Sequence, residues 1–459
     1  MENSEAIETE QVAGTISERD IEELQDAIDD HDVRWVDRHL RRMHPADAAD
    51  LLEQLSYERV QELVGILGGE LPPNILIELR DEYREGAIQA MPDAAVATAI
   101  DELDSDDATT ILEDLEDDRR ERILVDLAPA ERAQYEQGLA FEEESAGRLM
   151  QREFVAAPEY WSVGDTIDYA RERGEELPET FYEIYITDPA YRPLGAVPLS
   201  QLLRTSRDTP LSAIMLPLLS NITTEMDQEE VAYQFQKYSL ASAPVLDDHG
   251  RLVGMITVDD MVDVIQDENT EDFLALSGVT SADTSDSVWD SIRARSPWLV
   301  VNVCTAFAVS AVISIFEGTL NKVVALAVLM PMISALGGNA GSQTLAVAVR
   351  AIAERELEGP AVRRTVVREL LTGLGNGLMF SLVVSGIILI WFGDLLLAGV
   401  AMAAVVMTFT WTCLLGILVP LGLKKLGADP AVASSVFVLT LTDVMAFFSF
   451  LGLATLVLL

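Results

Sequence analysis

The chain has 459 residues, enough for several domains, and its formal net charge of -45 excludes nucleic acid as a partner, because phosphates would be repelled. With only four lysines, this acidity is typical of a halophilic protein surface, and also of carboxylates that bind divalent cations; both interpretations stay open. Cys304 and Cys413 both lie in apolar segments, so the sequence indicates neither a disulfide framework nor a thiolate metal site.

The charge is confined to the first part of the chain. From Pro297 onward the chain has eight acidic and eight basic residues and is therefore neutral, whereas the preceding part has 68 acidic and 23 basic residues. The sequence therefore predicts an acidic soluble module followed by a membrane module. The N-terminus, MENSEAIETE, has no basic or apolar run, so no signal peptide is expected there.

Residues 1–150 are expected to form an all-α domain. From residue 17 to about 140, units such as HPADAADLLEQLSYERVQELVGIL and MPDAAVATAIDELDSDDATTILEDL begin at a proline and repeat apolar residues at helical spacing. Recurrent units of this kind are typical of a short superhelix of repeats. No catalytic motif occurs in this part.

From about Gln151, short β segments alternate with helices. The stretches FYEIYITDPAYRPLGAVPLSQLL and ASAPVLDDHGRLVGMITVDDMVDVI are two copies of one strand–turn–strand–helix unit. The repeat resembles a tandem pair of α/β cystathionine-β-synthase (CBS) domains, at 151–205 and 206–267. In that family such units either bind nucleotides or serve as a dimerising scaffold.

The resemblance to CBS domains implies one possible nucleotide site. The second copy has the ribose-binding pattern as Gly254, Thr257 and Asp260. At the corresponding positions the first copy has Gly195, Pro198 and Gln201, which lose both hydrogen-bonding positions. ATP is therefore a possible ligand at one site only.

Residues 268–296 are expected to form a connecting helix that continues into the first membrane span. The segment around it, DVIQDENTEDFLALSGVTSADTSDSVWDSIRARSPW, begins with closely spaced acids. Because such carboxylates repel one another unless cations bridge them, their arrangement could depend on ion concentration.

Residues 297–459 are expected to form a five-helix transmembrane domain, since about 20 apolar residues suffice to cross a bilayer. The spans run roughly from Trp298–Phe316, Lys322–Val349, Leu370–Phe392, Leu395–Leu423 and Pro430–Leu459. Five arginines follow the second span, two lysines follow the fourth, and the link after the third has no basic residue. By the positive-inside rule the N-terminal and CBS domains are cytoplasmic and the C-terminus extracellular.

The second span is predicted to be broken. Pro331 removes a backbone hydrogen bond and Gly337, Gly338 and Gly341 weaken the helix further. Asn339, Ser342 and Gln343 place polar atoms among these glycines, which lipid tolerates only against protein or a watery cavity. This pattern favours a pore wall lined by these six residues; a glycine-mediated helix contact is the alternative.

Asp443 lies about 20 Å along the fifth span, near mid-membrane. An ionisable residue there is by default a candidate for an ion path, with a buried, protonated structural aspartate as the alternative. No basic residue lies deep in any span, so a cation is the natural partner. Carboxylate, amide, hydroxyl and carbonyl oxygens favour a hard cation such as partly hydrated Mg²⁺, held by one aspartate from each subunit of a symmetric dimer.

The order of parts resembles the MgtE family of magnesium channels over essentially the whole chain, and the acidity suggests a haloarchaeal member. The segments that carry the resemblance are GGNAGSQ, DPAVASSVFVLTLTDV, FEEESAGRLM, TEMDQEEVA, RLVGMITVDD and TEDFLALSGV. The resemblance implies that Asp443 binds Mg²⁺ in a pore at the dimer axis and that Asn339 lines its entry. It also implies that the connecting helix is a plug that closes the pore.

Regulatory magnesium sites are implied only by the same resemblance. Carried onto matching positions, their ligands are Asp227, Glu229, Asp260, Asp263, Glu268, Glu271 and Asp272, with Asp429 at the membrane face. Ser239 stands where the family has an acid, which weakens one site. The ligands of the N-terminal domain do not transfer residue by residue.

The sequence thus predicts a homodimeric, Mg²⁺-selective channel of the cell membrane that closes when cytoplasmic Mg²⁺ binds the acidic interfaces. It is not expected to be an enzyme, because no nucleophile or metal motif such as HExxH occurs. The alternative is a secondary transporter of divalent cations coupled to protons or sodium, with Asp443 carrying the coupling ion. A magnesium sensor without transport is a third interpretation.

Overall fold

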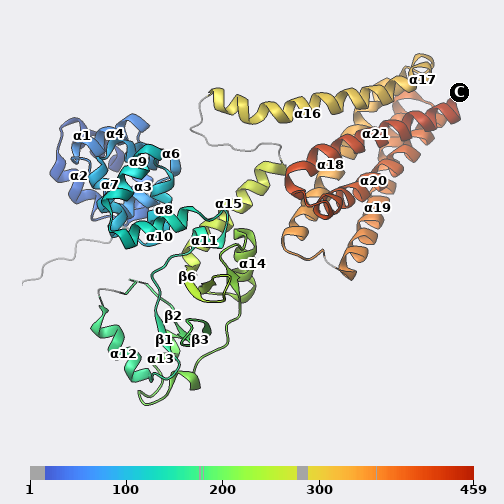
Figure 1. Ribbon diagram of the computed structural model, residues 1–459. Helices are drawn as coiled ribbons and strands as arrows, with labels where there is room; N and C mark the ends of the chain where they lie inside the picture. Colours follow the sequence, from blue (N-terminus) through green and yellow to red (C-terminus); the bar gives the residue numbers. More distant parts are fainter. Residues whose placement is uncertain (1–15, 175–176, 179, 277–287, 358) are drawn as a thin grey trace, which may run out of the picture. The chain divides into compact units, whose positions relative to one another are not determined.

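The computed structural model describes residues 16–174, 177–178, 180–276, 288–357 and 359–459. The chain forms two compact units, Met1–Ile265 and Gln266–Leu459. Figure 1 shows the helical N-terminal part, the two small sheets and the long apolar helices. The division falls inside helix α15 (Val258–Leu276), and not at Pro297, where the charge of the sequence changes.

The N-terminal part of the first unit consists of short helices. In chain order they are α1 (Glu18–Asp29), α2 (Val33–Leu40), α3 (Pro45–Leu52), α4 (Tyr57–Ile66), α5 (Pro73–Glu78), α6 (Asp81–Ala90), α7 (Asp93–Glu102), α8 (Ser105–Glu113), α9 (Asp117–Asp126), α10 (Pro129–Leu139) and α11 (Ala146–Leu149). The predicted all-α domain is confirmed.

The starts of these helices follow from local sequence. Ser17 caps α1 by accepting a hydrogen bond from the amide of Asp20, and Asp20 returns the contact to complete a capping box. Proline is the first residue of α3, α5 and α10, where a missing N–H has no helical partner to lose. Pro45 of the first quoted repeat is therefore a helix start, and Pro92 of the second is the N-cap residue of α7.

Ion pairs between arginines and acids about one repeat away connect successive turns of this domain. Arg59–Asp29 (2.5 Å), Arg80–Glu53 (2.6 Å), Arg84–Asp114 (2.5 Å) and Arg119–Asp93 (2.8 Å) join residues 26 to 30 positions apart. Together with a continuous core that includes Leu24, Leu63, Ile88 and Ile111, they stack the helices as a superhelix.

Two three-stranded sheets of matching topology follow. Their elements are β1 (Ala156–Pro158), α12 (Val163–Glu172), β2 (Glu183–Thr187), β3 (Pro193–Pro198), α13 (Leu199–Leu202) and η2 (Leu211–Ala213) for the first, and β4 (Ile222–Thr223), α14 (Gln228–Tyr238), β5 (Ser242–Leu246), β6 (Leu252–Thr257) and α15 for the second. Each sheet has a parallel pair followed by an antiparallel hairpin, in the order β1-β2-β3 or β4-β5-β6. The predicted tandem repeat is confirmed.

The two hairpins use the same turn. Asp188 accepts hydrogen bonds from the amides of Ala190 and Arg192, and Asp247 accepts them from His249 and Arg251. Gly250 adopts a left-handed conformation (φ 73°) in the second turn, where only a glycine is free of strain. The first turn puts Tyr191 in that region (φ 63°). The repeat therefore extends to the side chains of the turns.

The second unit is built on long apolar helices. They are α16 (Val288–Ile315), the short α17 (Glu317–Lys322), α18 (Ala325–Ala353), α19 (Pro360–Phe392), α20 (Leu395–Lys425) and α21 (Pro430–Leu458). Among the described residues, five of them are long and apolar enough to cross a membrane, which confirms the five predicted spans. Their core is formed mainly by α18, α20 and α21, with Ile333, Ala404 and Phe450 at its centre.

One prediction about these helices is wrong, and another lies partly outside the described residues. α18 runs without interruption through Pro331 and the glycines, so the predicted break in the second span is wrong. Neighbouring helices and the low bulk of glycine allow a transmembrane helix to tolerate such residues. The connecting helix predicted at 268–296 is seen as the end of α15 and the start of α16, and residues 277–287 lie outside the described part.

Candidate functional site

Asp443 lies at the contact between α18 and α21, half-buried among the membrane-spanning helices. The hydroxyl of Ser334 on α18 donates a hydrogen bond of 2.5 Å to Asp443 Oδ1. Among the described residues no lysine, arginine or histidine forms an ion pair with this carboxylate. Asp443 is thus a carboxylate in a membrane helix that is held by a neutral hydroxyl.

α18 and α21 run antiparallel along this contact. A Cβ atom added at Gly338 would lie 3.7 Å from Leu439 Cδ2, and one added at Gly341 would lie 3.4 Å from Val438 Cγ1. Ser334 and Asp443 are the next pair in this register, one helical turn from Gly338 and Leu439. The contact of Ser334 with Asp443 is therefore part of a regular helix pairing.

The polar residues of the second span lie on one exposed face of α18. Asn339, Ser342 and Gln343 are all exposed, whereas the residues between them face the rest of the chain. Asn339 follows Ser334 by five residues on the same helix. The structure thus brings Ser334 and Asp443 together and gives α18 a polar face that no other described part of the chain covers.

Two of the glycines predicted to line a pore are packed inside the chain. Gly337 and Gly341 are buried, and a Cβ atom added at either would lie 2.7 to 2.9 Å from threonine methyl groups of α20. This is the glycine-mediated helix contact that the sequence left as the alternative. Gly338, which is half-buried, has open space apart from Leu439.

The end of α15 packs against the transmembrane helices within the second unit. Ala275 is buried in one cluster with Leu345, Val349 and Val438, and Leu276 and Val419 border it. Residues of α18, α20 and α21 thus contribute to this cluster. The predicted plug helix therefore ends on an apolar seat formed by the helices that carry Asp443 and Asn339.

In the first unit, acids of the N-terminal domain lie close to the start of α15. The pKa of Asp107 on α8 is raised to about 7, mainly by burial and next by the negative charge of Asp260. The same two causes raise the pKa of Asp106. Burial and the charge of Asp259 raise the pKa of Asp260 to about 6, although a hydrogen bond from Thr257 acts in the opposite direction. Each of these carboxyl groups therefore disfavours the charged form of its neighbours.

A second electrostatic contact joins the same two parts. The carboxylates of Glu78, at the end of α5, and Asp263, on α15, are close enough for the charge of Asp263 to raise the pKa of Glu78, after burial, which is the larger cause. The pKa of Asp263 is itself raised by burial and by the negative charge of Asp259. The predicted residues Asp260 and Asp263 thus lie opposite acids of the N-terminal domain that sequence reasoning did not identify.

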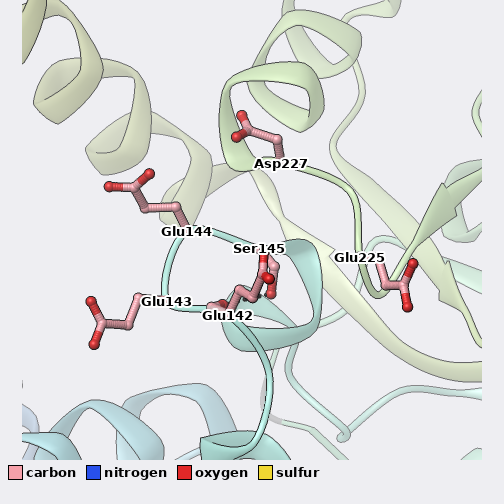
Figure 2. Close-up of a pocket in the computed structure, with 6 residues that line it drawn as sticks. All are labelled: Glu142, Glu143, Glu144, Ser145, Glu225 and Asp227. Carbon is pink, nitrogen blue, oxygen red and sulfur yellow. Dashed lines mark hydrogen bonds between the residues drawn. The ribbon is translucent and has the colours of Figure 1, made fainter.

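Asp227 lines a second acidic site, an open cleft of about 360 Å³ (Figure 2). Backbone hydrogen bonds from Ala146 to Met226 and from Gln228 to Glu144 hold the FEEESAGRLM segment against the start of α14. The cleft is lined, without any basic residue, by Glu142, Glu143, Glu144, Ser145, Glu225 and Asp227. Figure 2 shows Glu143 and Glu144 on one side and Glu225 on the other, so the carboxylates do not converge on one point.

The predicted regulatory residues lie on several different elements. Asp227 caps α14 by accepting a hydrogen bond of 2.9 Å from the amide of Glu229. Glu268, Glu271 and Asp272 lie later on α15, within the second unit, and Asp429 directly precedes the first residue of α21. Within the described residues, no group of three or more His, Cys, Asp or Glu side chains is arranged to hold a metal ion.

The predicted nucleotide residues are partly brought together. Thr257 Oγ1 donates a hydrogen bond of 2.6 Å to Asp260 Oδ2 at the junction of β6 and α15. Gly254 faces the chain itself, because a Cβ atom there would lie 2.7 Å from Met150 Sδ and 2.8 Å from the carbonyl oxygen of Gln151. Gly254 therefore allows the Met150–Gln151 segment to pack closely on β6, and Thr257 and Asp260 form a hydrogen-bonded pair.

Sequence reasoning missed Ser334, Asp106, Asp107 and Glu78. Ser334 lies in PMISALGGNAGSQ, and its spacing from Asn339 gives no sign that it faces Asp443 on another helix. The acids of the N-terminal domain occur in a strongly acidic background, in which no local pattern separates them from solvated carboxylates. Their position becomes apparent only from the tertiary structure.

Comparisons with known proteins cover nearly the whole chain. Residues 330–453 match the MgtE family model, described as a divalent cation transporter, residues 43–144 match the MgtE intracellular N domain and residues 212–267 match a CBS domain. Among solved structures, the cytosolic domain of the Mg²⁺ channel MgtE in complex with ATP covers 53% of this chain and 99% of its own, with 31% identity and a TM-score of 0.49.

Two full-length relatives are both described as magnesium transporter MgtE. The Thermus thermophilus protein is 33% identical over 443 residues, which cover 95% of this chain and 98% of the relative. The Bacillus subtilis protein is 29% identical over 440 residues, which cover 95% of this chain and 94% of the relative. With this extent of similarity and the architecture described above, the chain belongs to the MgtE family.

Proposed function

We propose that the protein is a homodimeric, Mg²⁺-selective channel of the cell membrane in which Asp443 binds the passing ion. As a member of a family of divalent cation transporters, the chain is a transport protein and not an enzyme. The observation that carries the proposal is the carboxylate of Asp443 inside a membrane-spanning helix, bonded to the hydroxyl of Ser334. Such a carboxylate is expensive in lipid unless a cation accompanies it.

The chemistry of the site favours magnesium. Asp443 offers a carboxylate and Ser334 a hydroxyl. Farther along the exposed face of α18, Asn339, Ser342 and Gln343 add amide and hydroxyl oxygens, and all of these oxygens are hard ligands. Mg²⁺ keeps several of its waters and binds protein through one or two carboxylates. The two full-length relatives are both described as magnesium transporters, which supports the same ion.

A dimer supplies the second wall of the pore. The exposed polar face of α18 cannot lie against lipid, because its amide and hydroxyl groups would have no partners there. A second copy related by a two-fold axis would cover this face and bring a second Asp443 to the ion. The two carboxylates would then balance the charge of one divalent cation.

Closure by cytoplasmic Mg²⁺ is supported by the acidic surfaces of the first unit. The charged forms of Asp106, Asp107 and Asp260 disfavour one another, and a bound cation would stabilise these charged forms and hold the N-terminal domain on the CBS pair. The cleft at Asp227 would act in the same way. Closure would fix α15 on the apolar seat formed by Leu345, Val349 and Val438.

The first unit is cytoplasmic in this proposal, and the C-terminus is extracellular. The support is the distribution of charge at the ends of the spans: arginines lie at the end of α18 and in the first turns of α19, Lys424 and Lys425 end α20, and the link between α19 and α20 carries no basic residue. Five spans place the two ends of the membrane domain on opposite sides.

A nucleotide such as ATP is a further proposed ligand of the CBS pair. The support is the hydrogen-bonded pair of Thr257 and Asp260, whose oxygens suit the hydroxyl groups of a ribose. The related cytosolic domain is described as a complex with ATP. Because Asp260 is also a proposed regulatory ligand, nucleotide and Mg²⁺ would influence each other at this position.

Magnesium uptake into liposomes tests the channel proposal. The wild-type chain should carry Mg²⁺ along its gradient, and Asp443→Asn and Asp443→Ala should abolish the flux. Asp394→Asn is the control: Asp394 caps α20 by accepting a hydrogen bond of 2.8 Å from Leu396, and asparagine caps equally well. Flux through both Asp443 variants at the wild-type rate would overturn the assignment of the pore.

The same preparation separates a channel from a coupled transporter. A channel conducts Mg²⁺ without a proton or sodium gradient, and its current reverses at the magnesium equilibrium potential. A coupled transporter requires the second gradient and stops when an ionophore collapses it. Flux that depends on that gradient would favour the alternative in which Asp443 carries the coupling ion.

Closure is tested by variants of the acidic contact in the first unit. Asp107→Asn and Asp260→Asn should raise the Mg²⁺ concentration needed to close the channel, because each removes a carboxylate ligand of the regulatory ion. Asp126→Asn, at an exposed position at the end of α9, is the control of equal charge change. Equal shifts in all three variants would assign the effect to net charge alone.

A further inference from the structure

Buried hydroxyl groups gather behind the proposed pore wall, where α18, α20 and α21 meet. Three of them make no hydrogen bond with any described residue, and their side chains are at most 1% exposed. We call this group the hydroxyl seam; it consists of Thr408 and Thr412 on α20 and Thr442 on α21. Buried polar groups in native proteins nearly always have a partner, so the seam requires an explanation.

The methyl groups of the three threonines pack on the glycines of α18. A Cβ atom added at Gly337 would lie 2.7 Å from Thr408 Cγ2 and 3.0 Å from Thr442 Cγ2, and one added at Gly341 would lie 2.9 Å from Thr412 Cγ2. The glycines thus receive the methyl groups, and two hydroxyls also border them: Thr412 Oγ1 lies 3.6 Å from the Cβ position of Gly337, and Thr442 Oγ1 lies 3.4 Å from that of Gly341. A valine at each position would provide the same methyl contact without an unsatisfied hydroxyl.

Other threonines of the same helices do find a partner. Thr410 on α20 donates 2.8 Å to the carbonyl of Val406, and Thr440 on α21 donates 2.7 Å to the carbonyl of Val436. Threonine in a membrane helix commonly bonds to the carbonyl one turn back in this way. The seam threonines depart from this habit at the three positions that face α18.

The seam joins the helices that carry the proposed pore to the helix that supports them. Thr442 is adjacent to Asp443 along α21, and Gly337 and Gly341 flank Asn339 along α18. Through the seam, α18 packs against α20 at Thr408 and Thr412 and against α21 at Thr442. Any widening between the pore face and α20 must therefore separate the glycines from the threonine methyls.

We propose that the hydroxyl seam binds water when the pore opens, so that hydration of the seam stabilises the conducting conformation. The inference rests on the proposed channel function. When α18 moves away from α20 and α21, the hydroxyls can hydrogen-bond to water that enters between the helices. A seam of valines would have no such gain, and the helices would stay in contact.

Recordings from the full-length protein in planar bilayers test this proposal. Thr412→Val and Thr442→Val should each lower the ratio of open to closed channels at low Mg²⁺ by about tenfold, the scale of one lost hydrogen bond. Single-channel conductance should stay as in the wild type, because neither hydroxyl meets the ion. Thr410→Val and Thr440→Val are the matched controls, because each lies two residues before a seam threonine on the same helix and bonds to a backbone carbonyl. Both controls should gate as the wild type does.

Osmotic stress provides a readout that a merely structural role would not change. An impermeant osmolyte draws water from the seam and should lower the open fraction of the wild type. The double variant Thr412→Val with Thr442→Val should respond less steeply, and Thr412→Ser, which keeps the hydroxyl, should respond as the wild type does. Thermal melting in detergent verifies that each variant is folded. If a valine variant is unfolded, the osmotic response of Thr412→Ser still tests the proposal.

The outcomes separate the two proposals. Seam variants that gate like their controls, or that keep the osmotic response of the wild type, would overturn the role of the seam while leaving the channel intact. A wild-type protein that passes no Mg²⁺ current would overturn the channel itself and the seam proposal with it. Loss of gating in the controls as well would assign the effect to threonine content and not to the seam.

Discussion

The hydroxyl of Ser334 donates a hydrogen bond of 2.5 Å to Asp443, and this contact joins the two helices that carry the proposed pore. The hydrogen bond holds one carboxylate oxygen of Asp443 in place, and this also fixes the orientation of the second oxygen. A carboxylate oriented in this way needs less rearrangement when an ion arrives, which favours binding.

Ser334→Ala should therefore weaken Mg²⁺ binding in the pore without abolishing it. Losing one hydrogen bond to a charged group amounts to about 1.5–3 kcal/mol, which would raise the Mg²⁺ concentration for half-maximal flux by roughly tenfold or more. Concentration-dependent uptake into liposomes measures this shift. Ser310→Ala is the control, because Ser310 is exposed and bonds to the carbonyl of Ala306; a similar shift there would contradict a specific role for Ser334.

Gly337 and Gly341 should resist substitution for reasons of packing. An alanine at either position brings a Cβ atom within 2.9 Å of a threonine methyl, and relieving such contacts typically costs about 1–3 kcal/mol. Gly386→Ala on α19, where nothing lies within 4 Å, should leave stability equal or slightly higher. Melting temperatures in detergent compare the three variants, and equal melting of all of them would rule out close packing at the two glycines.

The architecture could be predicted from the sequence because each of its signals is local. Apolar length marks the five spans, prolines mark the helix starts of the repeats, and Asp188 and Asp247 mark matching turns. The predicted break at Pro331 was wrong, since local propensity does not include the packing of α18 against α20 and α21.

The candidate site could be predicted only in part. Asp443 was recognisable because a lone carboxylate in an apolar run has no local explanation. Its partner Ser334 and the separation of the glycines from Asn339 depend on which face of α18 meets α20, and that is a tertiary property. The acids of α8 opposite Asp260 were missed for the same reason: the distance between them in sequence is more than 150 residues.

The nucleotide proposal predicts a specific effect of Thr257. Thr257→Val removes the hydroxyl that contacts Asp260 while keeping the size of the side chain, so ATP affinity should fall by about tenfold. Calorimetric titration of the full-length protein in detergent measures the affinity. The control is Thr270→Val, which removes a hydroxyl bonded to the carbonyl of Gln266 at an exposed position of α15. Absence of ATP binding by the wild type would exclude the site.

The apolar seat of α15 predicts a change in closure. Ala275 is 7% exposed against Leu345, Val349 and Val438, so a larger, charged side chain there cannot be accommodated. Ala275→Glu should therefore leave the channel conducting at Mg²⁺ concentrations that close the wild type. Thr270→Glu adds the same charge at an exposed position of the same helix and serves as the control. Current at high cytoplasmic Mg²⁺ distinguishes the two variants, and complete closure of Ala275→Glu would show that the end of α15 has no part in shutting the pore.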